Sequence, residues 1–185
     1  FRGQRKINFR TGMTEKTARP RGGEKRKKIR VLFVCLGNIC RSPAAEGVLR
    51  AKAREQGLDD CLEVDSAGTY GGHAGQLPDP RMREAALRRG YSLTHRARQV
   101  RREDFSQFDR IVAMDASNYR NLCRLAPSSQ AAERVVRMAD YFRRFSGQQE
   151  VPDPYYEGRE GFERVLDLLE DACQGLLEEI TAEKE

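Results

Sequence analysis

Four short, mainly apolar segments recur along the chain, at residues 29–34, 61–64, 111–114 and 135–138. Each run is too short for a typical globular helix and is rich in β-branched or other apolar residues, which predicts buried strands. The first run ends at Val34, directly before Cys35. Longer segments with helical spacing of apolar residues separate the runs, so strands and helices are expected to alternate.

Capping and stop signals bound three of the predicted helices. Ser42-Pro43 opens a helix that closes at Gly57, because serine is a good N-cap and proline suits the first turn. Asp79-Pro80 opens a second helix that ends at Gly90, and a third covers residues 115–122. The last predicted helix is long and amphipathic, with one apolar face formed by Phe162, Val165, Leu166, Leu169, Cys173 and Leu176.

This alternation predicts an α/β fold with an open parallel sheet covered by helices on both faces. Such sheets bind ligands at the carboxyl ends of their strands. Cys35, Asp65 and Asp115 each lie just past the end of a predicted strand. We therefore expect a functional site at this edge of the sheet.

Charge divides the chain into two regions. Residues 1–30 have 12 Lys or Arg and 2 Glu, whereas the other 155 residues have 22 basic and 26 acidic side chains. Residues 1–28 lack apolar periodicity, which predicts a disordered basic tail before a domain at 29–185. Residues 1–12 precede the first methionine and are interpreted as added or upstream sequence. The tail has the charge to contact acidic partners, although an inert tail is the simpler interpretation.

The cysteine pattern argues against two structural uses of cysteine. The chain has five cysteines, an odd number, at irregular spacings and without a CxxC pair. This pattern disfavours a disulfide framework or a zinc ribbon and favours a reducing compartment, for which we expect the cytoplasm. No apolar run reaches the roughly 18 residues of a membrane span, so none is expected.

The segment from Val34 to Pro43 has the residues for covalent phosphate chemistry. It runs from a predicted strand into a helix N-terminus, where backbone N–H groups and the helix dipole attract an anion. Gly37 is expected to allow a positive φ, and Arg41 is able to bind a phosphoryl group with two hydrogen bonds. This field favours the thiolate of Cys35, the reactive form, and the hydroxyl of Ser42 is able to donate to its sulfur.

Each of these features alone has a simpler explanation. A single cysteine after an apolar strand is most often a buried structural thiol, and a glycine-containing turn is weak evidence for a ligand. The combination Cys-x5-Arg-Ser at a strand-to-helix junction is far more specific. It is not a nucleotide P-loop, because the Gly-Lys-Ser/Thr ending is absent.

The sequence resembles the low-molecular-weight protein tyrosine phosphatases over about residues 29–180. The resemblance rests on Cys35–Pro43 and Asp153-Pro154-Tyr155-Tyr156, with further matches at 65–69, 78–81, 95–99 and 114–118. It implies a flavodoxin-like four-stranded parallel sheet, no cofactor or metal, and a phosphocysteine intermediate. The substrates implied are phosphotyrosine proteins, and the product is inorganic phosphate.

The resemblance also implies roles for individual residues. Cys35 is the nucleophile, and Asp153 is the general acid and then the general base. Asn38, Ser66 and His95 match positions that support the loop, and Cys40 matches a redox partner of the nucleophile. The phosphate is expected to be bound by the residues of the loop, which are Leu36, Gly37, Asn38, Ile39, Cys40, Arg41 and Ser42.

Tyr155 and Tyr156 resemble the aromatic wall of this family's substrate site. Many members have a further aromatic residue in the loop after Asp65-Ser66. Gly72 stands at the matching position here, and Tyr70 or His73 is a candidate to fill the gap. This departure concerns substrate preference.

Three other functions remain open. An arsenate reductase of the same fold needs further resolving cysteines, but Cys61, Cys123 and Cys173 are predicted in a strand and on helices. A protein-arginine phosphatase has threonine where this chain has Ile39, and isoleucine favours an aryl phosphate. A non-catalytic phosphate-binding module would not need the nucleophile, the arginine and the acid together.

Overall fold

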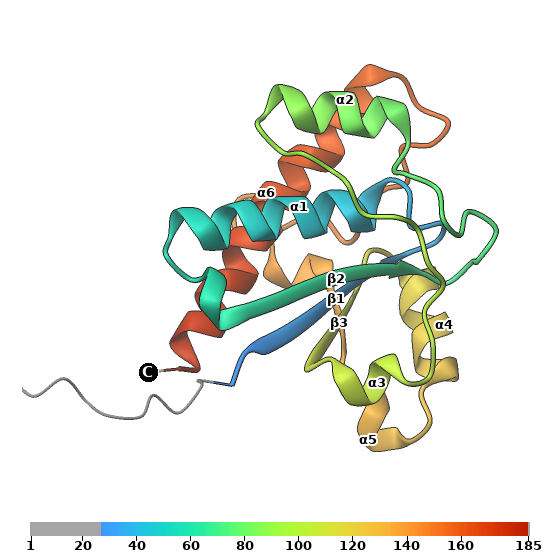
Figure 1. Cartoon of the computed structure of the whole chain (residues 1–185), viewed down its shortest axis with the longest axis vertical. Coiled ribbons are helices and arrows are strands. Elements are labelled where there is room, and N and C mark those ends of the chain that lie inside the picture. Colours follow the sequence, from blue (N-terminus) through green and yellow to red (C-terminus); the bar gives the residue numbers. More distant parts are fainter. Residues whose placement is uncertain (1–26, 185) are drawn as a thin grey trace, which may run out of the picture.

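The computed structural model describes residues 27–184, so the predicted basic tail lies almost wholly outside the described residues. Its four strands form one parallel sheet in the order β2-β1-β3-β4 (Figure 1). The strands are β1 (Ile29–Cys35), β2 (Leu62–Gly68), β3 (Arg110–Ala113) and β4 (Val135–Arg137). The predicted α/β class and parallel sheet are confirmed.

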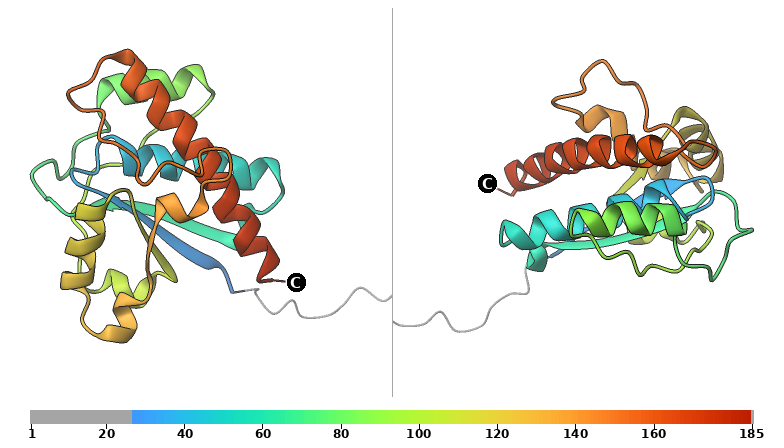
Figure 2. Two further views of the ribbon diagram at one scale, coloured as in Figure 1. Left: turned by 180° about the vertical axis from the view of Figure 1, so that it is seen from behind. Right: turned by 90° about the horizontal axis from the view of Figure 1, so that it is seen from above.

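Helices cover both faces of this sheet (Figure 2). One face has α1 (Arg41–Glu55), α2 (Pro80–Arg88) and α6 (Arg159–Ala182). The other face has the shorter helices α3 (Asp104–Gln107), α4 (Ala116–Leu125) and α5 (Ser129–Ala132). The short 3₁₀ segments η1 (Asp59–Cys61) and η2 (Met138–Tyr141) flank β2 and β4.

Strand β1 separates two apolar cores because its side chains alternate between the faces. Val31, Phe33 and Cys35 join the core under α1 and α6, whereas Leu32 and Val34 join the core under α3 and α4. The six apolar residues predicted on one face of the C-terminal helix are all buried in the first core. Burial of each large apolar side chain contributes about 1.5–3 kcal/mol, which holds α6 on the sheet.

Strand β2 differs from its prediction in position and length. Cys61 lies in η1, and the strand continues through Gly68, so Asp65 lies within the strand rather than past its end. The strand lies at the sheet edge, where β1 is its neighbouring strand and Gly68 alone bridges to Gln99 among the described residues, so outward-facing polar side chains such as Glu63 are tolerated. An apolar run therefore marked only half of the strand.

Two of three predicted helix starts are correct in detail. Asp79 caps α2 by accepting a hydrogen bond from Arg81 N, and Asp115 caps α4 by accepting one from Asn118 N. Ser42 does not cap α1, which begins at Arg41 after Cys40 without a side-chain cap. The Ser42 hydroxyl instead makes hydrogen bonds with Cys35 and Asn38 before the helix and with Ala67 O on β2.

Within residues 27–184, no helix is both long enough and apolar enough to span a bilayer.

Candidate active site

The loop between β1 and α1 folds over the carboxyl end of the sheet. Thr69 N donates to Cys35 O at 2.9 Å, and Tyr70 N donates to Leu36 O at 2.8 Å. A Cβ atom on Gly68 would lie 2.6 Å from Leu36 O and 3.0 Å from Asn38 N. Gly68 is therefore required, because any side chain there would displace the loop from the end of β2.

Cys35 is the last residue of β1, and its thiol lies in the hollow of this loop. Its Sγ lies 3.0 Å from Ser42 Oγ, and this hydroxyl also accepts a hydrogen bond from Asn38 Nδ2 at 2.8 Å. With Asn38 as its donor, the hydroxyl is able to direct its own proton to the sulfur or to Ala67 O, which lies 3.3 Å away. The predicted contact between Ser42 and Cys35 is thus present.

The positive φ of the loop occurs at Asn38, with φ of 57°, and not at Gly37 as predicted. Asparagine tolerates this region better than most residues, and its side chain is fixed at both ends. Asn38 Nδ2 donates to Ser42 and Ser66, while Oδ1 accepts from His95 Nε2 and Arg98 N, both at 2.9 Å. These hydrogen bonds offset the strain of the conformation.

Arg41 begins α1 and is almost fully buried beneath the loop. Its Nη1 donates to Asp115 Oδ2 at 2.7 Å and to Val151 O at 3.0 Å. Burial opposes the charge, but Cys35 and the carboxylate of Asp115 keep the pKa of Arg41 above its ordinary value. The guanidinium is therefore a fixed cation next to the sulfur.

Asp153 approaches the same guanidinium from the loop before α6. Its Oδ2 lies 3.7 Å from Arg41 Nη2, and its Oδ1 accepts a hydrogen bond from Tyr155 N at 3.1 Å. The side chain is 43% exposed, so it is open to a bound substrate and to water. The structure thus brings Asp153 from the loop before α6 to Cys35 and Arg41, which flank the β1–α1 loop.

A cavity of about 230 Å³ opens above this group. Aromatic rings form its rim: Tyr155 is 38% exposed and packs edge-to-face on Tyr156, which is 95% exposed. The remaining lining residues are Cys35, Leu36, Gly37, Ile39, Cys40, Arg41, Tyr70, His73 and Asp153. A hollow of about 420 Å³ near Arg50 is larger, but its lining contains no cysteine, histidine or serine.

Tyr70 and His73 occupy the region where Gly72 leaves a gap. Both line the cavity, with their rings edge-to-face at a centroid distance of 6.0 Å. A Cβ atom on Gly72 would overlap the Tyr70 ring, so that ring lies where a side chain at position 72 would begin. Tyr70 and His73, instead of a side chain at position 72, therefore form this part of the cavity rim.

The chain is similar to phosphatases of one family. The family model for low molecular weight phosphotyrosine protein phosphatases matches residues 30–185. The chain belongs to this family. A low molecular weight protein-tyrosine-phosphatase of Streptomyces coelicolor is 48% identical over 149 residues, which cover 80% of this chain and 91% of that protein.

Solved structures agree with this assignment. A protein tyrosine phosphatase from Entamoeba histolytica, with Hepes in the active site, is 44% identical with a TM-score of 0.82, over 85% of this chain and 100% of that chain. YfkJ from Bacillus subtilis is 41% identical with a TM-score of 0.80, over 90% of this chain and 100% of that chain. The protein is thus a low-molecular-weight phosphotyrosine protein phosphatase, as the resemblance implied.

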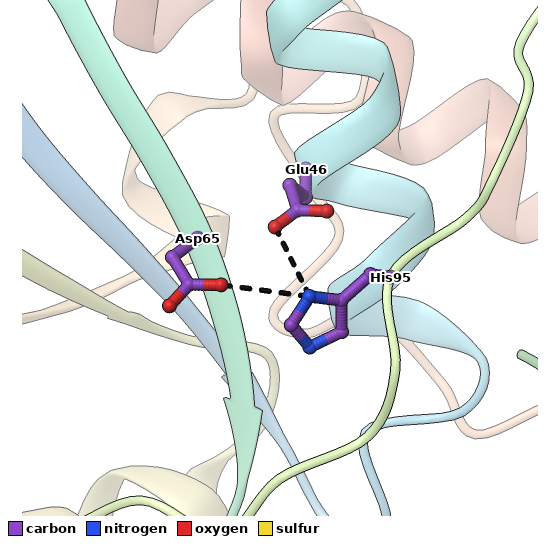
Figure 3. Close-up of side chains that lie close together, drawn as sticks. All are labelled: Glu46, Asp65 and His95. Carbon is purple, nitrogen blue, oxygen red and sulfur yellow. Dashed lines mark ion pairs between the residues drawn. The ribbon is translucent and has the colours of Figure 1, made fainter. Parts of the chain in front are cut away.

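His95 of the phosphatase lies between two carboxylates, Glu46 on α1 and Asp65 on β2 (Figure 3). Its Nδ1 is 3.5 Å from Glu46 Oε1 and from Asp65 Oδ1. Burial raises the pKa of Glu46 to about 7. His95 Nδ1 and one oxygen each of Glu46 and Asp65 lie within 4.8 Å of one another, a spacing that could hold a metal ion. However, Arg98 already lies 3.0 Å from the Asp65 carboxylate, and Arg50 lies 3.6 Å from the Glu46 carboxylate. We therefore interpret the cluster as an ion-pair group that orients His95.

Cys40 of the phosphatase lines the cavity and is buried. Burial raises the pKa of its thiol well above the ordinary value, and the nearby Asp79 carboxylate adds to this effect. Cys40 is therefore a neutral thiol in the resting enzyme. Cys61 and Cys123 are half-buried, and Cys173 is buried in α6.

Two residues of the phosphatase site were not assigned a role from the sequence. Asp115 holds Arg41, and Gly68 makes room for the loop. The sequence places Asp115 after a strand, at the start of a helix and in a segment that matches the family, but without a role. The signal available was its position at the carboxyl end of β3, beside the strand that carries Cys35.

Proposed function

We propose that this phosphatase hydrolyses protein phosphotyrosine through a phosphocysteine on Cys35, with Asp153 as general acid and base. One observation carries the proposal: the Cys35 thiol, the Arg41 guanidinium and the Asp153 carboxyl group meet at one cavity. The loop from Leu36 to Ser42 supplies backbone donors around the same point. No cofactor is needed for this chemistry.

In the first step the Cys35 thiolate attacks phosphorus in line with the leaving oxygen. The S–P bond forms as the P–O bond to the tyrosyl group breaks, and the Asp153 carboxyl group gives its proton to that oxygen. Arg41 and the loop N–H groups hold the equatorial oxygens, where charge is carried in the transition state. The fixed contacts of Arg41 support this role.

In the second step water attacks the phosphocysteine. The Asp153 carboxylate takes a proton from the water, the S–P bond breaks, and inorganic phosphate leaves with Cys35 again a thiolate. The Ser42 hydroxyl, 3.0 Å from the sulfur, stabilises the returning charge. Each cycle consumes one water and regenerates every group.

The cavity rim supports a phosphorylated aromatic substrate. Tyr155 and Tyr70 offer ring faces or edges to a tyrosyl ring, and Ile39 adds an apolar side chain at the loop. Phosphotyrosine, phosphoarginine and serine phosphate peptides of one sequence, assayed for phosphate release, test this preference. Faster turnover of the phosphoarginine peptide would replace the proposal by the arginine phosphatase alternative, and arsenate-dependent oxidation of thioredoxin would favour the reductase.

A burst experiment tests the mechanism. Rapid mixing with p-nitrophenyl phosphate should release one p-nitrophenolate per enzyme before the steady state, because phosphoenzyme forms first. Cys35→Ser should abolish the burst and turnover yet keep phosphate binding. Activity above about 1% of wild type in this variant would remove Cys35 from the nucleophile role.

We further propose that the enzyme works in the cytoplasm, where its thiols stay reduced, and is reversibly inactivated by peroxide. The supporting observation is that Cys40 lines the cavity into which Cys35 opens. Contact of the basic tail with acidic partners remains a proposal for residues outside the described part of the chain.

A further inference from the structure

Arg98 lies behind the active-site loop, and two carboxylates hold its guanidinium. Asp104 accepts from Nη1 at 3.0 Å and from Nη2 at 3.1 Å, and Asp65 accepts from Nη2 at 3.0 Å. Asp104 is 1% exposed and also accepts from Arg101 N at 2.8 Å. A planar, forked guanidinium between two carboxylates has little freedom to move.

The backbone of Arg98 is joined to the end of β2. Gly68 N donates to Arg98 O at 2.9 Å, and Val100 N donates to Gly68 O at 2.8 Å. The Arg98 N–H then donates to Asn38 Oδ1 at 2.9 Å. The side chain is therefore anchored on one side while the backbone N–H reaches the phosphate-binding loop on the other.

This contact determines how the Asn38 amide is oriented. A backbone N–H only donates, so the Asn38 atom that it meets must be the carbonyl oxygen, and Nδ2 must point to Ser42 and Ser66. The Ser42 proton then has two acceptors, Cys35 Sγ at 3.0 Å and Ala67 O at 3.3 Å, and the sulfur is the nearer one. Arg98 is thus connected to the Cys35 sulfur through the hydrogen-bonded side chains of Asn38 and Ser42.

Asp65 links this arrangement to His95. Its Oδ2 accepts from Arg98, and its Oδ1 faces His95 Nδ1 at 3.5 Å (Figure 3). His95 and Arg98 are the two donors to Asn38 Oδ1. One carboxylate on β2 therefore helps to place both donors.

We propose that Arg98, held by Asp104 and Asp65, is a positioning residue for phosphoryl transfer that acts through Asn38. It touches neither substrate nor sulfur. The clamped guanidinium keeps the backbone N–H of Arg98 aligned with Asn38 Oδ1. This hydrogen bond holds the left-handed turn at Asn38 and keeps the Ser42 hydroxyl next to Cys35. The inference rests on the proposed role of Cys35 and adds a residue that the mechanism itself does not name.

The first test replaces the clamp without removing the backbone donor. Arg98→Met keeps the N–H and loses the fork, and Arg102→Met is the matched control, because Arg102 is exposed in the same segment. We expect kcat on p-nitrophenyl phosphate to fall about 10- to 100-fold in Arg98→Met, with weaker inhibition by phosphate, because small displacements at a reacting centre have effects of this size. The control should stay within about twofold.

A double-mutant comparison separates positioning from mere stability. Asn38→Ala removes the residue through which Arg98 is proposed to act, so adding Arg98→Met to it should lower kcat by less than about threefold. All assays are run well below the melting temperature of each variant. A loss that multiplies in the double variant, or a wild-type kcat in Arg98→Met, overturns the proposal.

Asp104→Asn is the second variant if Arg98→Met does not fold. It keeps an acceptor of the same shape and weakens the clamp, so a smaller loss of kcat with the same non-additivity is expected. Retained activity in Cys35→Ser would instead contradict the proposed function, which distinguishes the two failures.

Discussion

Ser42 Oγ, in the first turn of α1, lies 3.0 Å from the Sγ of Cys35, the last residue of β1. A hydrogen bond to a charged group contributes about 1.5–3 kcal/mol, so its loss should matter most when the sulfur leaves as thiolate. Ser42→Ala should therefore slow hydrolysis of the phosphoenzyme by roughly 10- to 100-fold, with a smaller effect on its formation. Stopped-flow burst kinetics measure both steps.

The control for Ser42 is Ser106→Ala, since Ser106 is exposed on α3 and donates only to Glu103 O in the described contacts. It should leave both phases unchanged. An equal slowing of both phases in Ser42→Ala would show a general disturbance of the loop instead of a role at the sulfur.

Asp153 is expected to matter in proportion to the basicity of the leaving group. Asp153→Ala should slow hydrolysis of phenyl phosphate by roughly 10²–10⁴, the usual contribution of a general acid. The loss should shrink for leaving groups of low pKa, which depart without a proton. A series of substituted phenyl phosphates measures this, with Asp59→Ala, an exposed acid on η1, as control. The same loss across the whole series would remove Asp153 from the acid role.

Glu46 should make the folded protein less stable as pH rises through the weakly acidic range. Burial raises the pKa of its carboxyl group from 4.5 to about 7, so the folded state holds a proton that the unfolded state has released. The free energy of unfolding should therefore fall between about pH 4.5 and 7, by up to about 3 kcal/mol relative to Glu46→Gln. The groups that face it are His95, Asp65, Arg50 and Arg98.

Urea unfolding at several pH values measures this difference, with the exposed Glu63→Gln on β2 as control. The wild type should lose stability relative to Glu46→Gln as pH rises, whereas Glu63→Gln should follow the wild type. A difference between wild type and Glu46→Gln that does not change with pH would contradict the shift.

Peroxide should inactivate the enzyme reversibly through Cys40. The Cys35 sulfur is expected to form a sulfenic acid with peroxide. The Cys40 thiol, which lines the same cavity, then attacks this sulfur, and the sulfenic hydroxyl leaves as water as the disulfide forms. Wild type should regain full activity with dithiothreitol, but Cys40→Ser should not, because its sulfenic acid is oxidised further. Equal recovery of the two proteins, or a disulfide mapped to Cys61 or Cys123, would disprove the pairing.

Much of the fold follows from the sequence because apolar runs and capping residues are local signals. They located all four strands and the long helix α6, but they missed the second half of β2, because its residues Asp65 to Gly68 are polar or small and do not continue the apolar run. The short helices α3 and α5, of four residues each, have too few turns for a periodic pattern.

The site was predicted less completely, because it depends on contacts between distant segments. Cys35, Arg41 and Ser42 are close in the sequence and mark the loop themselves. Asp115 meets Arg41 only because β3 lies beside β1. The left-handed turn at Asn38 likewise depends on donors from the 95–98 segment, and such long-range support leaves no local pattern.

Trapping the phosphoenzyme tests the central claim most directly. Wild type is mixed with a phosphotyrosine peptide, denatured within one turnover, digested and analysed by mass spectrometry. The account predicts one phosphoryl group on the peptide that contains Cys35, attached through sulfur, and none in Cys35→Ser. A phosphoryl group on another residue, or continued turnover without any phosphoenzyme, would contradict it.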